Sequence, residues 1–260
     1  MKKRKIKHSI KKKVKNHKKK FKTIRKKEIR IPIGIPNFDN LIEGGFEKNS
    51  INTIVGGAGS GKSIFSTQFL IEGLKNGEKC LYVTFEEKKS RFYHNMKDFG
   101  WDLAEFEKKG LFIFLEYTPA KVKTMLEEGG GEIENIVISN KVSRIVIDSI
   151  TSFALLFEDE LAKREAALSL FNMIREWSCT SVLTLEEDPG EDKKTASKSM
   201  EFESDSIILF YYARNKAKRK RYIEILKMRG TKHAREIYQF DIGKKGISIR
   251  QDPIPSFKSA

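Results

Sequence analysis

The 260-residue sequence has few cysteines, few prolines and no long apolar run. Cys80 and Cys179 lie in apolar stretches without metal-ligand spacing, so we expect buried thiols and neither a disulfide framework nor a zinc site. The longest strongly apolar run, Ile207 to Ala213, is far shorter than the roughly 20 residues that span a bilayer. The first 30 residues also lack the roughly 7 to 15 consecutive apolar residues of a secretion signal. These absences predict a cytoplasmic protein without a membrane span.

Acidic residues are almost missing from residues 1–30. This segment carries 17 basic side chains and one acid, Glu28, whereas the remaining residues carry 34 basic and 34 acidic side chains. The formal net charge of +16 therefore belongs to the segment and not to the body. We expect a basic tail over residues 1–30 that is disordered in isolation, followed by a single domain over residues 31–260.

The apolar residues of the tail have the spacing of one helical stripe. They are Ile6, Ile10, Val14, Phe21 and Ile24. A lysine-covered segment with such a stripe can fold against a polyanion, and we expect nucleic acid, RNA or DNA, as its partner. An anionic membrane surface and a solvated tail without a dedicated partner are the alternatives.

Beyond the tail, short β-branched runs alternate with apolar residues at helical spacing. The strand-like runs lie at residues 51–55, 80–85, 111–115, 144–148 and 181–185. This alternation predicts an α/β fold with a mainly parallel sheet flanked by helices. After Asp205 the runs are separated by short polar turns and lie at residues 207–212, 222–228, 236–242 and 247–250. They predict antiparallel hairpins that extend the same sheet.

One motif points to chemistry directly. Residues 56–63 read GGAGSGKS, and they match the P-loop (Walker A) pattern G-x-x-x-x-G-K-[ST] at every fixed position, between a predicted strand and a predicted helix. In such a loop, backbone N–H groups converge on phosphate; Lys62 would neutralise the β- and γ-phosphates, and the Ser63 hydroxyl would ligate Mg²⁺. The predicted nucleotide-binding residues are Gly57, Ala58, Gly59, Ser60, Gly61, Lys62, Ser63 and Ile64.

Nucleotide hydrolysis also needs carboxylates, and two strand ends supply them. The buried run 144–148 ends in Asp148, which is placed to hold the metal, usually through water. The run that ends at Phe85 is followed by Glu86 and Glu87, where the strand beside a P-loop meets the γ-phosphate. An acid there can orient or deprotonate the attacking water. The predicted catalytic residues are therefore Glu86, Glu87 and Lys62, and the predicted cofactors are ATP and Mg²⁺.

Five segments together resemble the KaiC-like branch of the RecA-type ATPases. They are the P-loop, YVTFEE, DFGWDL, RIVIDSI and KMRGTKH. The resemblance covers about residues 31–250 and implies a RecA-like core of the single-domain, archaeal type. It also implies a homo-oligomeric ring, usually a hexamer, with ATP between neighbours and Glu86 as the base. The segment KMRGTKH would reach the adjoining subunit's nucleotide through Lys227, Met228, Arg229, Thr231 and His233, with Lys227 and Arg229 at the γ-phosphate.

The sequence departs from this branch at several points. The clock protein that names the branch has two such domains, whereas this sequence has room for one. Glu201 and Phe202 stand where that protein's second domain has its phosphorylated Ser and Thr, which argues against autokinase activity. Asp98 and the pair Gly243-Lys244 replace polar residues that contact nucleotide in the branch, so recognition of the base and ribose stays open.

The favoured interpretation is a Mg²⁺-dependent ATPase whose nucleotide state controls ring assembly or binding of an unidentified protein client. A RadA-like DNA-handling ATPase is the nearest alternative, because it shares the fold and the P-loop. In RecA-type recombinases, DNA lies against the loops after the fourth and fifth strands. Here these loops contain residues 152–163 and 186–200, respectively, which are net acidic and suit a phosphate backbone poorly. A non-hydrolysing nucleotide-dependent scaffold ranks last, because all the groups for hydrolysis are present.

Overall fold

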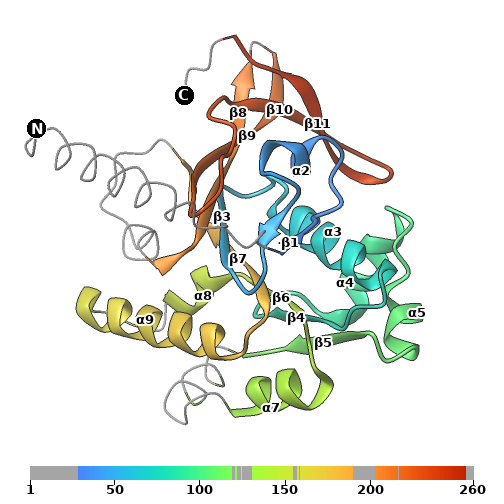
Figure 1. The fold of residues 1–260 in the computed structure, drawn as a ribbon, viewed down its shortest axis with the longest axis vertical. Helices are drawn as coiled ribbons and strands as arrows, with labels where there is room; N and C mark the ends of the chain where they lie inside the picture. Colours follow the sequence, from blue (N-terminus) through green and yellow to red (C-terminus); the bar gives the residue numbers. More distant parts are fainter. Residues whose placement is uncertain are drawn as a thin grey trace, which may run out of the picture.

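A mixed nine-stranded sheet forms the centre of the molecule (Figure 1). The structure is a computed structural model that describes residues 29–118, 121, 124, 131–154, 157, 159–189, 203–215 and 217–255. The strand order is β11-β10-β9-β8-β3-β7-β6-β4-β5. The parallel strands are β3 (Ile51–Gly56), β4 (Cys80–Thr84), β5 (Phe112–Glu116), β6 (Arg144–Asp148), β7 (Thr180–Glu186) and β8 (Ser206–Asn215).

The C-terminal strands complete the sheet as an antiparallel meander. They are β9 (Lys218–Met228), β10 (Tyr238–Gly243) and β11 (Gly246–Pro253). Because β9 pairs with β8, which in turn pairs with β3, the hairpins join the sheet directly beside the P-loop strand. The prediction of a parallel α/β core extended by antiparallel hairpins is confirmed.

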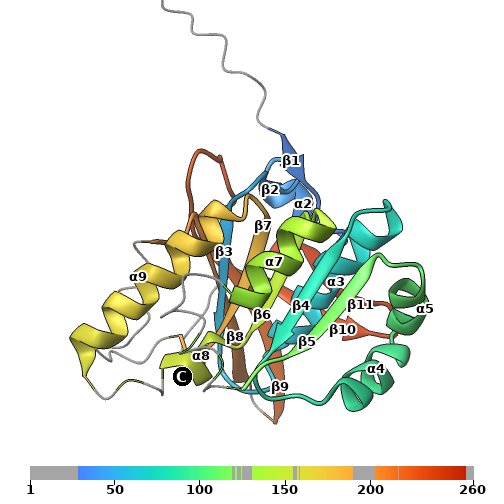
Figure 2. The same cartoon turned by 90° about the horizontal axis from the view of Figure 1, so that it is seen from below.

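Helices cover both faces of the sheet. Successive side chains along each strand point alternately to one face and to the other. On one face lie α2 (Phe38–Leu41), α3 (Lys62–Lys75), α4 (Lys89–Lys97) and α5 (Leu103–Lys108). Figure 2 views the sheet from the other face, which carries α7 (Gly131–Asn140) and α9 (Glu160–Glu176); the short α8 (Ile150–Ala154) follows β6. On β4, Tyr82 faces the α3 side, whereas Leu81 and Val83 face the α9 side. In the described part of the chain, no helix is long and apolar enough to cross a membrane.

The turn-rich stretch before β3 contains a small unit of its own. β1 (Arg30–Ile31) pairs antiparallel with β2 (Phe46–Glu47), and α2 lies between them. The Asp39 carboxylate accepts hydrogen bonds from the backbone N–H groups of Ile33 and Gly34, at 2.9 and 3.1 Å. The sequence pattern indicated only turns here, because the elements are too short to show a period.

The parallel arrangement decides where polar groups meet. The carboxyl ends of β3, β4, β6 and β7 lie at one edge of the sheet, which is where ligands bind in open α/β folds. The P-loop follows β3 at this edge. The acid pair Glu86 and Glu87 lies just beyond the end of β4, and Asp148 is the last residue of β6. Sequence segments up to about 90 residues apart are therefore brought to one place.

Candidate active site

The P-loop wraps the amino end of α3. Gly59 and Gly61 have φ angles of 72° and 111°, which side-chain-bearing residues rarely adopt. Gly61 is the residue immediately before α3. The unpaired N–H groups of the first turn of α3 therefore point toward the loop. The Lys62 ammonium donates to the carbonyl oxygens of Gly56 and Gly57, at 2.6 and 3.1 Å. The loop thus has the backbone shape that phosphate binding needs.

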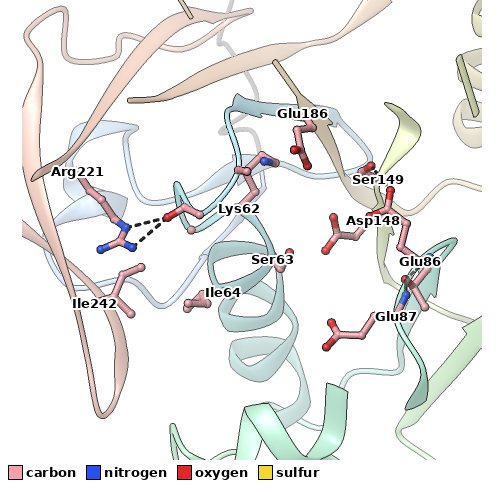
Figure 3. A pocket seen from close by; sticks show the side chains of 14 residues that line it. Lys62, Ser63, Ile64, Glu86, Glu87, Asp148, Ser149, Glu186, Arg221 and Ile242 are labelled. Atoms are coloured by element: carbon pink, nitrogen blue, oxygen red, sulfur yellow. Dashed lines mark hydrogen bonds between the residues drawn. The ribbon is translucent and has the colours of Figure 1, made fainter. Parts of the chain in front are cut away.

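A pocket of about 420 Å³ opens at this loop (Figure 3). Nine residues that the sequence predicted line it: Ala58, Gly59, Gly61, Lys62, Ser63, Ile64, Glu86, Glu87 and Asp148. Gly57 and Ser60 belong to the same loop but do not line the pocket. Ser60 is fully buried, and its hydroxyl is the one buried side-chain oxygen or nitrogen in the described residues that has no hydrogen-bond partner.

Asp148 is held by hydroxyl groups from the two neighbouring strands. The Tyr82 hydroxyl on β4 donates to Asp148 Oδ2 at 2.5 Å, and the Thr184 hydroxyl on β7 donates to Oδ1. Both oxygens of the predicted metal-side carboxylate are therefore held by hydroxyl groups.

The donor set at this point fits Mg²⁺. One hydroxyl and one carboxylate, completed by water and phosphate oxygens, are the ligands that Mg²⁺ takes in nucleotide sites. The described part of the chain contains no group of three or more His, Cys, Asp or Glu side chains placed to hold a metal ion. A cation at Ser63 and Asp148 would therefore depend on the nucleotide for further ligands.

The two glutamates of the acid pair have different surroundings. Glu86 Oε1 accepts hydrogen bonds from the hydroxyl groups of Ser149 (3.3 Å) and Ser152. Glu87 Oε1 accepts one from the Asn95 amide at 3.0 Å. Burial raises the pKa of the Glu87 carboxyl, and the Asp148 carboxylate adds to the effect. The serines thus orient Glu86. Desolvation makes the Glu87 carboxylate more basic than that of an ordinary glutamate.

Carboxylates surround the P-loop lysine. Burial lowers the pKa of Lys62, and the nearby carboxylates of Glu186, Asp148, Asp188 and Glu86 oppose this effect by favouring the ammonium. Lys62 is 7% exposed. The negative charge around a buried ammonium keeps it charged, so that it can serve as a phosphate ligand.

Sequence reasoning did not assign several residues of the pocket. Glu186 ends β7 beside Asp148, and its signal was the same as that of Asp148, an acid that ends an apolar run. Arg221 donates from Nε and Nη2 to the Gly59 carbonyl, at 3.1 and 3.0 Å, and stacks on Tyr212 at 4.4 Å. Figure 3 shows Arg221 and Ile242 on the side of the loop away from the carboxylates. Arg221 is the last residue of the basic run KRKR, and nothing in that run predicts the contact. The contact depends on how β9 pairs with β8.

The predicted in-trans segment lies far from the P-loop of its own chain. Met228 pairs with Ser206, which pairs with Asn52 at the start of β3, four residues before Gly56. At about 3.3 Å per strand residue, that separates the segment from its own P-loop by roughly 13 Å along the sheet. The structure therefore does not bring Lys227 or Arg229 to the pocket of the same subunit.

Contacts with the N-terminal unit hold this segment in place. The Arg30 guanidinium donates to the Thr231 hydroxyl at 2.6 Å, and Ala234 N–H donates to the Leu41 carbonyl at 2.9 Å. At its base, Lys227 Nζ donates to the Ser204 carbonyl at 2.8 Å, Arg229 pairs with Asp205 at 3.3 Å, and the His233 ring contacts the Ala234 carbonyl.

Comparison with known proteins agrees with this geometry. The sequence model of the KaiC ATPase family matches residues 31–254. The chain belongs to the KaiC family of ATPases. Membership in the KaiC family places it among nucleotide-binding ATPases, and the matched range includes the P-loop, the acid pair and the segment KMRGTKH.

Its relatives include both long and short members of the KaiC family. The chain is 35% identical over 230 residues to the circadian clock protein KaiC3 of Synechocystis, covering 85% of this chain and 45% of KaiC3. It is 31% identical over 238 residues to a UPF0273 protein of Pyrococcus furiosus, covering 86% and 95% of the two chains. The chain thus spans about half of the clock protein and nearly all of the shorter one.

A solved structure shows the same fold. The crystal structure of a KaiC-like protein from Pyrococcus horikoshii matches with a TM-score of 0.77 and 35% sequence identity, covering 86% of this chain and 99% of that one. The RecA-like fold of the KaiC family is therefore established for this chain.

Proposed function

We propose that this protein is a Mg²⁺-dependent ATPase that works as a homo-oligomeric ring, with ATP bound between subunits and its nucleotide state controlling assembly or binding of a protein client. The observation that supports the proposal most is the meeting of the P-loop, Asp148 and the acid pair in one pocket at the carboxyl edge of the sheet. ATP would lie against the P-loop, whose N–H groups and Lys62 take the phosphates.

The chain's own groups have separate tasks in this proposal. When bound, Mg²⁺ would neutralise charge that develops on the phosphates, held by Ser63 and Asp148. Glu86, oriented by Ser149 and Ser152, would accept a proton from the attacking water or align it. Glu87 would support it as a second carboxylate of raised pKa.

Steady-state phosphate release tests the enzyme. We expect Lys62→Ala and Glu86→Gln to lose most of the activity, the latter by a factor of about 10² to 10⁴ for a general base. Glu116→Gln is a matched control, because Glu116 also ends a strand at this edge but pairs with Lys88 at 3.1 Å outside the pocket. A wild type no faster than the two site variants would contradict hydrolysis and favour a scaffold.

The in-trans contribution is proposed from the place of the segment. Lys227, near the end of β9, and Arg229, just after it, lie at the sheet end opposite their own P-loop, so a contact of theirs with nucleotide would be made in a neighbouring subunit's site. Met228, Thr231 and His233 would come near the same nucleotide. Cations supplied this way would make hydrolysis depend on assembly.

Mixed rings test this arrangement. Lys62→Ala has an intact turn but a defective P-loop, and Arg229→Ala has the reverse, so each alone should be inactive. Co-assembly creates some interfaces with an intact P-loop and an intact turn, and we expect partial recovery of phosphate release. Arg250→Ala, which removes a surface arginine paired with Asp241 at 3.1 Å, should leave activity unchanged. No recovery from mixing, with mixed assembly verified by mass, would mean that Arg229 acts within its own subunit.

Charge argues against the DNA-handling alternative. The described carboxylates Glu186 and Asp188 lie near Lys62, at the start of the segment where a RecA-type recombinase holds DNA. They would repel a phosphate backbone, so we assign any nucleic-acid binding to the basic tail, which lies almost wholly outside the described residues. Steeply salt-dependent, sequence-indifferent binding that disappears when the lysines of residues 1–28 are replaced by glutamine would support this assignment.

A further inference from the structure

The hydroxyl of Tyr82 contacts the carboxylate that the proposed function gives to the metal. It donates to Asp148 Oδ2 at 2.5 Å. Tyr82 is 1% exposed, so water does not compete for this bond. A buried hydroxyl on β4 thus holds the carboxylate at the end of β6.

Packing fixes the position of this oxygen. The Tyr82 ring lies 4.4 Å from the ring of Phe92 on α4 and stacks on that of Phe114 on β5 at 5.6 Å and 6°. The ring is therefore held on two sides within the core, and its hydroxyl cannot turn toward solvent. A tyrosine hydroxyl that faces a carboxylate is the donor of the pair.

The direction of the hydrogen bond to Asp148 follows from this. A protonated phenol has one hydrogen, and a carboxylate can only accept, so that hydrogen goes to Asp148. Each carboxylate oxygen has a further lone pair, so Asp148 can accept this bond and still face a cation.

We propose that Tyr82 is a positioning residue that orients the Asp148 carboxylate for a divalent cation. This inference rests on the proposed function, because it assumes that this carboxylate faces a metal–nucleotide complex. Thr184 completes the arrangement by donating to the other oxygen of Asp148. Partners of this kind fix ligand orientation before the metal arrives, and their loss typically weakens metal binding by about 10- to 100-fold.

Manganese binding provides a test that does not depend on catalysis. The affinity of the full-length protein for Mn²⁺ is measured by electron paramagnetic resonance with ADP present, and ADP affinity is measured separately without metal. For Tyr82→Phe, which keeps the ring and removes the hydroxyl, we expect about tenfold weaker Mn²⁺ binding and unchanged metal-free ADP affinity. Tyr93→Phe is the control, because it removes a hydroxyl bonded to Glu107 at 3.1 Å, away from the pocket.

A second pair of variants guards against a general loss of structure. Thr184→Val should also weaken Mn²⁺ binding, whereas Thr184→Ser, which keeps a hydroxyl, should retain most of it. Equal Mn²⁺ affinity in wild type and Tyr82→Phe would overturn the positioning role while leaving the proposed function intact. A wild type that binds ADP but no Mn²⁺ would overturn both, because there would be no cation to position.

Discussion

The ion pair between Glu78 and Arg144 stabilises the part of the fold that carries the site. Arg144, the first residue of β6, is fully buried and donates from Nε and Nη2 to the Glu78 carboxylate, at 2.8 and 2.7 Å. Its Nη1 donates to the carbonyl oxygens of Pro32 and Phe69, at 2.7 and 2.9 Å. One guanidinium therefore ties together the N-terminal unit, α3 and β6, whose other end is Asp148.

Replacing Glu78 with alanine leaves this buried guanidinium without its hydrogen-bonded counter-charge. Two charge-assisted hydrogen bonds of roughly 1.5 to 3 kcal/mol each are lost, while the bonds to Pro32 and Phe69 and the stacking on the Phe69 ring at 4.8 Å remain. Breaking one partner of a buried pair typically costs about 3 to 5 kcal/mol. We expect Glu78→Ala to lower the free energy of unfolding by that amount, a large part of the stability of an average domain.

Chemical denaturation followed by circular dichroism measures this loss, and Glu105→Ala serves as the control. Glu105 pairs with Lys109 on the surface at 2.6 Å, and an exposed pair of this kind contributes about 1 kcal/mol or less. A Glu78→Ala loss no larger than that of Glu105→Ala would refute the reasoning, because it would show that Arg144 does not need its counter-charge.

Acid should remove the same contribution. Hydrogen bonds from Arg144 hold the pKa of Glu78 below its ordinary value, so its stabilising effect is complete above the unfolded pKa of about 4.3. It is lost as the pH falls through the lower folded pKa. The difference in stability between wild type and Glu78→Ala should therefore be constant from neutral pH to about 5 and shrink below about pH 4. A difference that grows on acidification would have the wrong sign.

Three further outcomes are expected. Gly73→Ala, which would stabilise an ordinary helix by about 1 kcal/mol, should instead destabilise this protein in denaturant titrations, because its Cβ would lie 2.5 Å from Arg144 Nε. The acid limb of phosphate release should have its midpoint above the ordinary glutamate value of about 4.3, since burial raises the pKa of Glu87 and delays its ionisation; Glu87→Gln should shift that limb. Arg221→Gln should weaken ATP binding about 3- to 10-fold by calorimetry, because two hydrogen bonds to the P-loop carbonyl of Gly59 are lost.

Much of the fold could be predicted from local signals. Each of these signals lies within a few residues of sequence. They are the β-branched run before the P-loop, the acid pair Glu86 and Glu87, and Asp148, and each has a known place at a strand end. The short elements of the N-terminal unit gave no period and were missed. The identity of Arg144 as a buried hub was also invisible, because an arginine at a strand start is ordinarily solvated.

The active-site prediction shows the same division. Lys62, Ser63, Asp148, Glu86 and Glu87 were assigned from motif and strand ends, and the structure brings them into one pocket. The sequence could not show which groups orient them. The serine hydroxyls at Glu86 and the phenol at Asp148 come from separate elements, and a contact between elements depends on strand order and register rather than on neighbouring residues.

The sequence by itself determined the α/β class, the phosphate loop, the acids of the site and the fact that the net charge of +16 belongs to residues 1–30. These features are local, since each depends on residue types within one short segment. Only the tertiary structure decided that Arg221 reaches the P-loop, that Tyr82 holds Asp148, and that the segment 227–233 lies away from its own pocket. Sheet pairing sets those relations, because it places residues distant in sequence at the same edge or at opposite ends.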